Sequence, residues 1–147
     1  MPTRSARTAW TGDLKTGSGD VELASSGAGT FDVSWPKRAA DDADGTTSPE
    51  ELVGAAHAAC YTMSLAGEIS RAGGTPKTLD VQADVTIGAD PAGGFRLTGI
   101  TLTVRGEVDG LDAEGFTKAA EAAKVGCPIS KALAGVDNIT LDAALTD

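Results

Sequence analysis

The sequence predicts an α+β fold, with helices packed on one face of antiparallel β-sheet. Short runs with a period of two open the chain, a strong helix start follows near residue 48, and two longer alternating runs come after that helix. Two shorter helical patterns and a last strand complete the order β-β-β-α-β-β-α-α-β. The length and the lack of a dividing linker predict one domain covering residues 1–147.

The first part of the chain predicts two or three antiparallel strands. Val21 and Leu23 alternate with polar neighbours, as do Phe31 and Val33, and glycine separates these runs. The polar segment PKRAADDADGTTS comes next. Its acidic and flexible composition predicts a loop.

The segment Ser48-Pro49-Glu50-Glu51 predicts the start of a long central helix. Serine suits the N-cap, proline suits the first helical position, and Glu51 can complete a capping box with Ser48. The helix should run to about Ala72 and end at the two glycines that follow. Because its middle is apolar on nearly every side, we expect it to be buried on most faces.

The second half of the chain predicts a hairpin, two helices and a strand. Two long alternating runs joined by DPAGG indicate the hairpin, Asp112 can cap a helix that stops at Gly126, and Pro128 opens a shorter helix. The predicted ranges are 78–89 and 96–108 for the hairpin, 113–124 and 128–135 for the helices, and 138–145 for the last strand.

Composition excludes several classes of protein. Twelve basic and twenty-one acidic residues give 12 − 21 = −9 with His57 neutral, which disfavours nucleic-acid binding. The start MPTRSARTAW has no apolar segment of a secretion signal, and the apolar run LVGAAHAACYTMSLAG is shorter than the roughly 20 residues of a membrane span. Two cysteines without a signal peptide indicate a reducing, cytoplasmic location.

Two cysteines and one histidine are the candidates for chemistry. Burial alone explains Cys60 among its alanines, and burial would raise its pKa. Cys127 precedes Pro128 at a helix N-terminus, where backbone N–H groups favour a thiolate, with a plain N-cap as an equal alternative. His57 shares a helix face with Cys60, and a buried histidine with one satisfied nitrogen is favoured over a Cys–His pair. With one histidine and no C-x-x-C, no zinc site is predicted.

Two charged residues have simple structural explanations when taken alone. Glu50 at the second helical position is stabilised by the helix dipole, and Arg38 can be a solvated charge near Asp41 and Asp42. The residues by themselves would not single out either one.

The chain nevertheless resembles the OsmC branch of the OsmC/Ohr peroxide-reducing proteins. The resemblance rests on TSPEELVGAAHAACYTMSLA followed by GCPISKAL, with the opening TAWTGDLKTGSG, in matching order over essentially the whole chain. It implies an OsmC/Ohr-like fold with a buried central helix in an intertwined homodimer. It also implies a cofactor-free, metal-free peroxidase that reduces organic hydroperoxides, and hydrogen peroxide more weakly, in oxidative or osmotic stress defence.

Carried over residue by residue, the resemblance implies four site residues. Cys60 matches the cysteine that attacks the peroxide, and Cys127 matches the resolving cysteine that forms a disulfide with it. Glu50 matches the glutamate of the S-P-E-E motif, and Arg38 matches the arginine that stabilises the thiolate. The family implies an external dithiol, with lipoyl-type donors leading, as the reductant.

Some details of this site stay open. Lys37 or Lys15 could take the place of Arg38 as the cation, and Tyr61 would add a hydroxyl close to the attacking thiol. An apolar wall for the body of the peroxide is expected from Ala56, Ala59, Met63 and Leu65.

The spacing of Glu50 and Cys60 predicts a dimer. Ten residues of helix separate them by about 15 Å, at 1.5 Å per residue. Either the helix bends sharply, or Glu50 serves the cysteine of a second chain across a two-fold axis. An antiparallel helix pair would also bury a helix that is apolar all round, so we expect an obligate homodimer with two composite sites.

Two other functions stay open from the sequence. A non-catalytic redox-sensing or small-molecule-binding module could use the same fold. A cysteine hydrolase using Cys60 and His57 ranks last, because no oxyanion-stabilising or orienting partner is recognisable.

Overall fold

The predicted order of elements is confirmed with one addition in the computed structural model, which describes residues 2–146. A short helix, α1 (Trp35–Arg38), occupies the beginning of the segment predicted to be a loop. Ser34 caps this helix by accepting a hydrogen bond from the N–H of Lys37, and proline stands in its first turn. The loop prediction is therefore wrong at its start, where local capping chemistry stabilises one helical turn.

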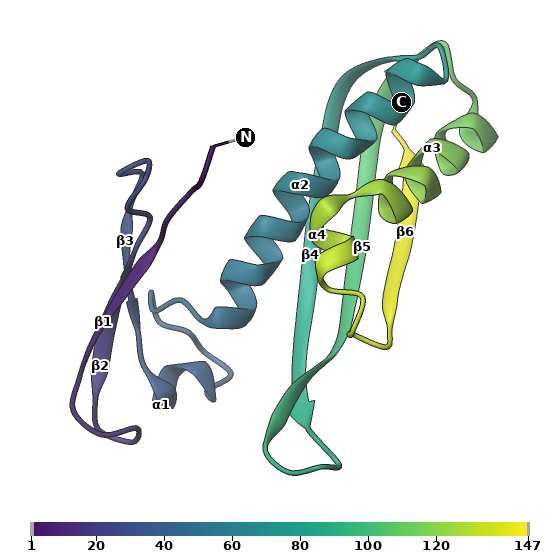
Figure 1. Ribbon diagram of the computed structural model, residues 1–147. Helices are drawn as coiled ribbons and strands as arrows, with labels where there is room; N and C mark the ends of the chain where they lie inside the picture. The colour runs from purple at the N-terminus through teal and green to yellow at the C-terminus, as the bar shows by residue number, and fades with distance from the viewer. Residues whose placement is uncertain (1, 147) are drawn as a thin grey trace. The chain divides into compact units, whose positions relative to one another are not determined.

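The chain divides into two units, one ending at Leu52 and the other beginning at Val53 (Figure 1). The predicted single domain stays a prediction, and its end residues, Met1 and Asp147, lie outside the described residues. The first unit contains an antiparallel sheet in the order β1-β2-β3, which confirms the predicted strands. These strands are β1 (Arg7–Thr11), β2 (Ser18–Glu22) and β3 (Thr30–Val33).

The second unit is built on a sheet in the order β4-β5-β6. Its strands are β4 (Thr75–Ala89), β5 (Phe95–Asp109) and β6 (Ile139–Leu145). β4 and β5 form the predicted antiparallel hairpin, but β6 pairs parallel to β5, so the prediction of purely antiparallel sheets is wrong for this strand. Parallel neighbours need a long crossover, and α3 (Ala113–Gly126) and α4 (Pro128–Ala132) supply it.

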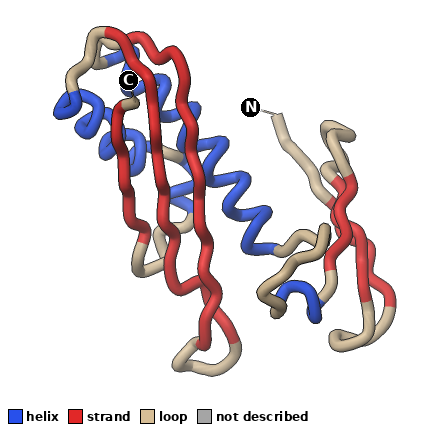
Figure 2. The backbone as a smooth tube through the Cα atoms, turned by 180° about the vertical axis from the view of Figure 1, so that it is seen from behind, coloured by secondary structure: helices blue, strands red, loops and turns tan. Residues whose placement is uncertain are grey.

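One face of this sheet carries the helices. In the β4–β5 hairpin Val81 pairs with Val104, whereas the neighbouring pair on the opposite face is Asp80 with Arg105. This alternation follows the predicted period of two. Helices α2 (Pro49–Arg71), α3 and α4 lie on the apolar face, in front of the sheet in Figure 1 and behind it in Figure 2.

The central helix begins and ends as its sequence predicts. Ser48 Oγ accepts a hydrogen bond from the N–H of Glu51 at 3.1 Å, whereas the Glu51 carboxylate binds the hydroxyl of Thr47 and leaves the capping box half formed. Gly73, at φ 87°, ends the helix. Among residues 2–146, neither this helix nor any other has the length and apolar character needed to span a bilayer.

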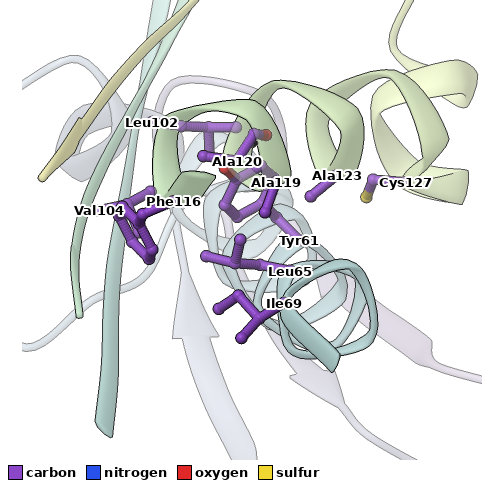
Figure 3. Close-up of a cluster of buried hydrophobic side chains, with 10 residues drawn as sticks. All are labelled: Tyr61, Leu65, Ile69, Leu102, Val104, Phe116, Ala119, Ala120, Ala123 and Cys127. Carbon is purple, nitrogen blue, oxygen red and sulfur yellow. Dashed lines mark hydrogen bonds between the residues drawn. The ribbon is translucent and has the colours of Figure 1, made fainter. Parts of the chain in front are cut away.

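Within one chain α2 buries a single stripe, spaced by four residues. Tyr61, Leu65 and Ile69 are fully buried against Phe116 of α3 and the β5 strand, as Figure 3 shows. Met63 on another side of α2 is 75% exposed. The expectation of burial on most faces is therefore not met by this chain on its own.

We expect Leu65→Ala to lower the free energy of unfolding by about 2–5 kcal/mol, because it opens a cavity where the helix meets the sheet. Val125→Ala is the control, since Val125 of α3 is 74% exposed and its change should stay within about 0.5 kcal/mol. Urea unfolding at one fixed protein concentration measures both. Equal effects of the two substitutions would contradict this description of the core.

Candidate functional site

The second unit brings the two cysteines together. Cys60 of α2 and Cys127 at the start of α4 are unbridged thiols that lie close enough for each to shift the pKa of the other. Cys127 is fully buried at the edge of the apolar core (Figure 3), and Cys60 is partly exposed and packs against the same core. The two cysteines are 67 residues apart in the sequence, a spacing that neither requires nor excludes a disulfide. The fold brings them together.

The surroundings of the two thiols favour charge on Cys127. Burial raises the pKa of the Cys60 thiol, and the neighbouring Cys127 raises it further. Burial also opposes ionisation of Cys127, but the N–H of Ser130, the Cys60 thiol, the Ser130 hydroxyl and the N–H of Ile129 outweigh it and lower the pKa of Cys127. Cys127 occupies the N-cap position without making a side-chain capping bond. The side-chain cap of the plain N-cap interpretation is therefore absent, and the thiolate interpretation stays a prediction.

His57 is a buried histidine with one satisfied nitrogen, as predicted. Its Nε2 lies 2.7 Å from Ser130 Oγ, and its Nδ1 has no hydrogen-bond partner. Burial lowers the pKa of His57, so the ring is neutral near pH 7. Because the ring bonds to Ser130, the Cys60–His57 pair of a hydrolase is not formed.

Ser130 is the residue that sequence reasoning missed. It stands three residues after Cys127 in the short helix that Pro128 opens, so it returns to the same side of that helix. The three-residue spacing from Cys127 was the sequence signal that could have identified Ser130. Within residues 2–146, no three His, Cys, Asp or Glu side chains lie together as a metal site would need.

The first unit contains a charged pair at the N-terminal end of α2. Arg38 Nε lies 3.2 and 3.1 Å from the two carboxylate oxygens of Glu50, and Arg38 Nη2 lies 2.6 Å from Oε1. Glu50 is only 8% exposed, and the guanidinium carbon lies 5.5 Å from the centre of the Trp35 ring. Burial opposes the charge of Glu50, but hydrogen bonds from Arg38 help to lower its pKa. Arg38 is therefore held in place and is not simply a solvated surface charge.

The two lysines that were possible alternatives to Arg38 are placed differently. Lys37 Nζ binds the exposed Asp44 at 3.0 Å, and Lys15 is exposed on the first unit. Neither of them holds Glu50. Of the three candidate cations, only Arg38 forms the pair that the resemblance implies.

A cavity of about 320 Å³ in the first unit adjoins this pair. Its walls are mostly apolar, with one guanidinium among them. The lining includes Trp10, Leu14, Val21, Trp35, Leu52 and Arg38. Such a cavity can hold a ligand that has an apolar body and one polar end. Sequence reasoning did not predict this cavity, because its lining residues come from five separate helices and strands and from the loops that connect them.

The apolar wall expected on α2 is only partly present. Ala56, Ala59 and Met63 line one exposed side of the helix, but Leu65 points into the core, so its assignment to the wall is wrong. Two residues of helix turn a side chain by about 200°, which separates Leu65 from Met63. The Tyr61 hydroxyl donates a hydrogen bond to the carbonyl of Ala120 at 2.9 Å and is directed into the same core.

With this geometry in hand, comparison with known proteins identifies the family. A family model described as "OsmC-like protein" matches residues 41–142. The chain belongs to the OsmC-like family. It is 40% identical over 133 residues to the peroxiredoxin OsmC of Escherichia coli, covering 90% of each protein, and 36% identical over 100 residues to the organic hydroperoxide resistance protein OhrA of Bacillus subtilis, covering 67% of each.

Solved structures place the fold in the same family. The chain is similar to an organic hydroperoxide resistance protein from Elizabethkingia anophelis, with a TM-score of 0.76 and 28% identity, covering 100% of this chain and 97% of that one. The predicted α+β, OsmC/Ohr-like fold is confirmed by this similarity.

We expect Arg38→Ala to lower the free energy of unfolding by roughly 1–2 kcal/mol at pH 7, because it leaves the Glu50 carboxylate buried without its donor. Lys37→Ala, which breaks an exposed pair, is the control and should cost no more than about 0.5 kcal/mol. The folded-state pKa of Glu50 lies below its ordinary value of 4.5, so the pair stabilises above that value and is lost as pH falls through the lower folded value. Urea unfolding from pH 7 to pH 3 should show the two variants converging.

Proposed function

We propose that this chain is a thiol-dependent peroxidase that reduces organic hydroperoxides, and hydrogen peroxide more weakly, in defence against oxidative or osmotic stress. The observation that carries the proposal is the contact between the Cys60 and Cys127 thiols. Membership of the OsmC-like family supports it, as do the relatives named peroxiredoxin and hydroperoxide resistance protein. The pair provides two electrons, which is what cleavage of one O–O bond requires.

The reaction begins at Cys60. Its thiolate attacks the terminal peroxide oxygen, the O–O bond breaks, and the alkoxide takes up a proton and leaves as an alcohol. Cys60 is then a sulfenic acid. The Cys127 thiolate attacks the Cys60 sulfur, so that an S–S bond forms while the S–O bond breaks and the oxygen leaves as water. The partial exposure of Cys60 and the complete burial of Cys127 support this division of roles.

Cys60 needs a cation to carry out this attack. Its pKa is raised by burial, so few Cys60 thiols would be ionised at neutral pH without help. Arg38 supplies the positive charge in our proposal, and Glu50 fixes the direction of its guanidinium. The apolar cavity beside Arg38 then takes the organic body of the hydroperoxide.

We assign the cation to the partner subunit of an obligate homodimer. Helix α2 is unbroken from Pro49 to Arg71, and ten residues of helix amount to about 15 Å between Glu50 and Cys60. The exposed side of α2 that contains Met63 is apolar, as a helix paired with a second copy requires. Each of the two sites would thus combine Arg38 and Glu50 of one subunit with Cys60 of the partner subunit.

An external dithiol completes the cycle by reducing the disulfide in two exchange steps. A lipoyl-type dithiol is the class we favour, because a vicinal dithiol closes its own ring as it leaves. The cytoplasm is the compartment we assign, because both cysteines are unbridged and the reducing conditions there keep thiols free.

We expect the protein to consume cumene hydroperoxide well beyond one equivalent per chain when dihydrolipoamide is present. Cys60→Ser should reduce this rate to background, because it removes the attacking sulfur. Cys127→Ser should still form a sulfenic acid but no internal disulfide. Peroxide consumption by a colorimetric assay and intact mass after one equivalent check these outcomes, the latter as a loss of two hydrogens in the wild-type protein.

The same assay separates catalysis from sensing. If consumption stops at one equivalent despite excess dithiol, the cysteines report oxidation without turnover, and the redox-sensing alternative replaces the peroxidase.

We expect Arg38→Ala and Cys60→Ser to be inactive alone and to complement each other when co-expressed. In the heterodimer one composite site has both mutations and the other has neither. Random pairing then restores about a quarter of the wild-type activity per chain, because half of the dimers are mixed and each has one intact site. No recovery would place Arg38 and Cys60 of one site in the same chain, and a monomer by light scattering at micromolar concentration would reject the dimer.

A further inference from the structure

A buried line of polar groups leads away from the thiol pair, and the chemistry proposed above leaves it unused. Ser130 Oγ lies 2.7 Å from His57 Nε2, and the hydroxyl and N–H of Ser130 both act on the Cys127 sulfur. His57 is fully buried and Ser130 is 8% exposed. The line therefore runs from His57 of α2 through Ser130 of α4 to Cys127 and back to Cys60 of α2.

The unpartnered nitrogen of His57 fixes the direction of these hydrogen bonds. A proton on Nδ1 would be a buried N–H donor with no acceptor, which is unfavourable. With the proton on Nε2, the ring donates to Ser130 Oγ. The single hydroxyl proton of Ser130 is then free to be donated to the Cys127 sulfur.

We propose that His57 and Ser130 are positioning residues that form a relay, which holds negative charge on the Cys127 sulfur and so sets the rate at which Cys127 closes the disulfide with Cys60. The part of this inference that concerns the rate of disulfide closure rests on the proposed peroxidase function. The hydrogen bonding of the relay in the resting protein does not depend on that function. Ionised Cys127 is the form that attacks a sulfenic acid, because the thiolate is the nucleophile.

The same relay selects the sulfur that leaves during reduction. In thiol–disulfide exchange the sulfur with the lower pKa leaves faster. Cys127 is stabilised as that leaving group by Ser130, and Cys60 is the sulfur that is partly exposed to an incoming dithiol. Accessibility and leaving-group stability therefore agree: the reductant attacks Cys60 and releases Cys127 as a thiolate, with the mixed disulfide on Cys60.

Charged and titratable groups approach this relay from three helices of the second unit. Lys124 of α3 and Lys131 of α4 line the same cavity as Ser130. Cys60, His57 and Tyr61 approach from α2, and Glu121 of α3 acts together with Cys127 on the Tyr61 hydroxyl. Burial keeps Tyr61 neutral by raising its pKa. Glu68 lies near Gly126 but is bound by Arg71. The sheet contributes apolar side chains to the core cluster beside it.

The first test is a thiolate titration that needs no peroxide. Absorbance at 240 nm follows Cys127 in Cys60→Ser and in Cys60→Ser combined with Ser130→Ala. We expect the second protein to titrate roughly one pH unit higher, because a lost hydrogen bond to a charged group of about 1.5 kcal/mol corresponds to one unit. Ser130→Thr keeps the hydroxyl and should restore the midpoint. Ser70→Ala is the matched control, since it removes an exposed serine hydroxyl bonded within α2.

An unchanged midpoint in the Ser130→Ala protein would overturn the relay, whatever the peroxidase does. If Ser130→Ala fails to fold, His57→Leu removes the relay from its other end, and His57→Gln keeps an N–H for comparison. The same titration then decides, with a higher midpoint expected for leucine than for glutamine.

The second test measures the two chemical steps in otherwise wild-type protein. Rapid mixing with cumene hydroperoxide and quenching with a sulfenic-acid trap separates sulfenic-acid formation from disulfide closure. In Ser130→Ala the ratio of closure rate to formation rate at pH 7 should fall by up to about tenfold, since raising a pKa by one unit lowers the thiolate fraction by at most tenfold. A loosened core would slow both steps and leave the ratio unchanged, which would contradict the proposal. If wild-type protein forms no sulfenic acid, the proposed function fails and the titration still judges the relay.

Discussion

The contact between Cys60 and Cys127 is the interaction on which the site depends, and the crossover between two parallel strands creates it. Helix α3 packs its alanines and Phe116 against α2 and ends at Cys127, directly beside the face of α2 that contains Cys60. Had β6 returned as the second arm of a hairpin, no helical crossover would have been needed at this position. The parallel pairing of β5 and β6 is thus a condition for bringing the thiols together.

The two sulfurs share one location but differ in environment. Cys60 is partly exposed, and no positively charged group acts on it among the described residues of its unit, whereas Cys127 is buried among the N–H groups of α4 and the hydroxyl of Ser130. A buried thiolate is costly unless hydrogen bonds replace the lost water. In our proposal the Ser130 hydroxyl provides such a bond, because His57 donates to the hydroxyl oxygen and leaves its proton for the sulfur. In our proposal Arg38 and Glu50 compensate for burial at Cys60 in the same way.

Local signals in the sequence predicted most of the fold. The caps at Ser48 and Asp112, the alternation of the hairpin and the glycines after α2 all act over a few residues, and all are found in the structure. The direction of β6 could not be predicted from local signals, because it depends on where the crossover helices place the start of the strand relative to β5. The one-turn helix at Trp35 was not predicted for a different reason. The acidic composition of the segment that follows indicated a loop, and Ser34 was therefore not considered as a helix cap.

The site was predictable only in part from the residues themselves. The singly bonded His57 followed from position and chemistry, which left the thiolate and the plain N-cap open for Cys127. Arg38 and Glu50 gained their roles from the family resemblance. Ser130 was overlooked because a serine in a short helix has ordinary structural uses. Contacts across 73 residues, such as the one between His57 and Ser130, are products of the tertiary fold that no local pattern encodes.

The long hairpin that supports α2 also has an edge strand, β4, whose backbone could pair with a strand of another molecule. β4 lies at an edge of its sheet in the order β4-β5-β6, and an edge strand offers unpaired backbone groups to any passing strand. Pro76 supplies no N–H near its start, and Asp80 and Asp84 place carboxylates on its polar face. An incoming strand would have to strip water from these charges. These features make pairing of the β4 edge with a strand of another molecule less favourable.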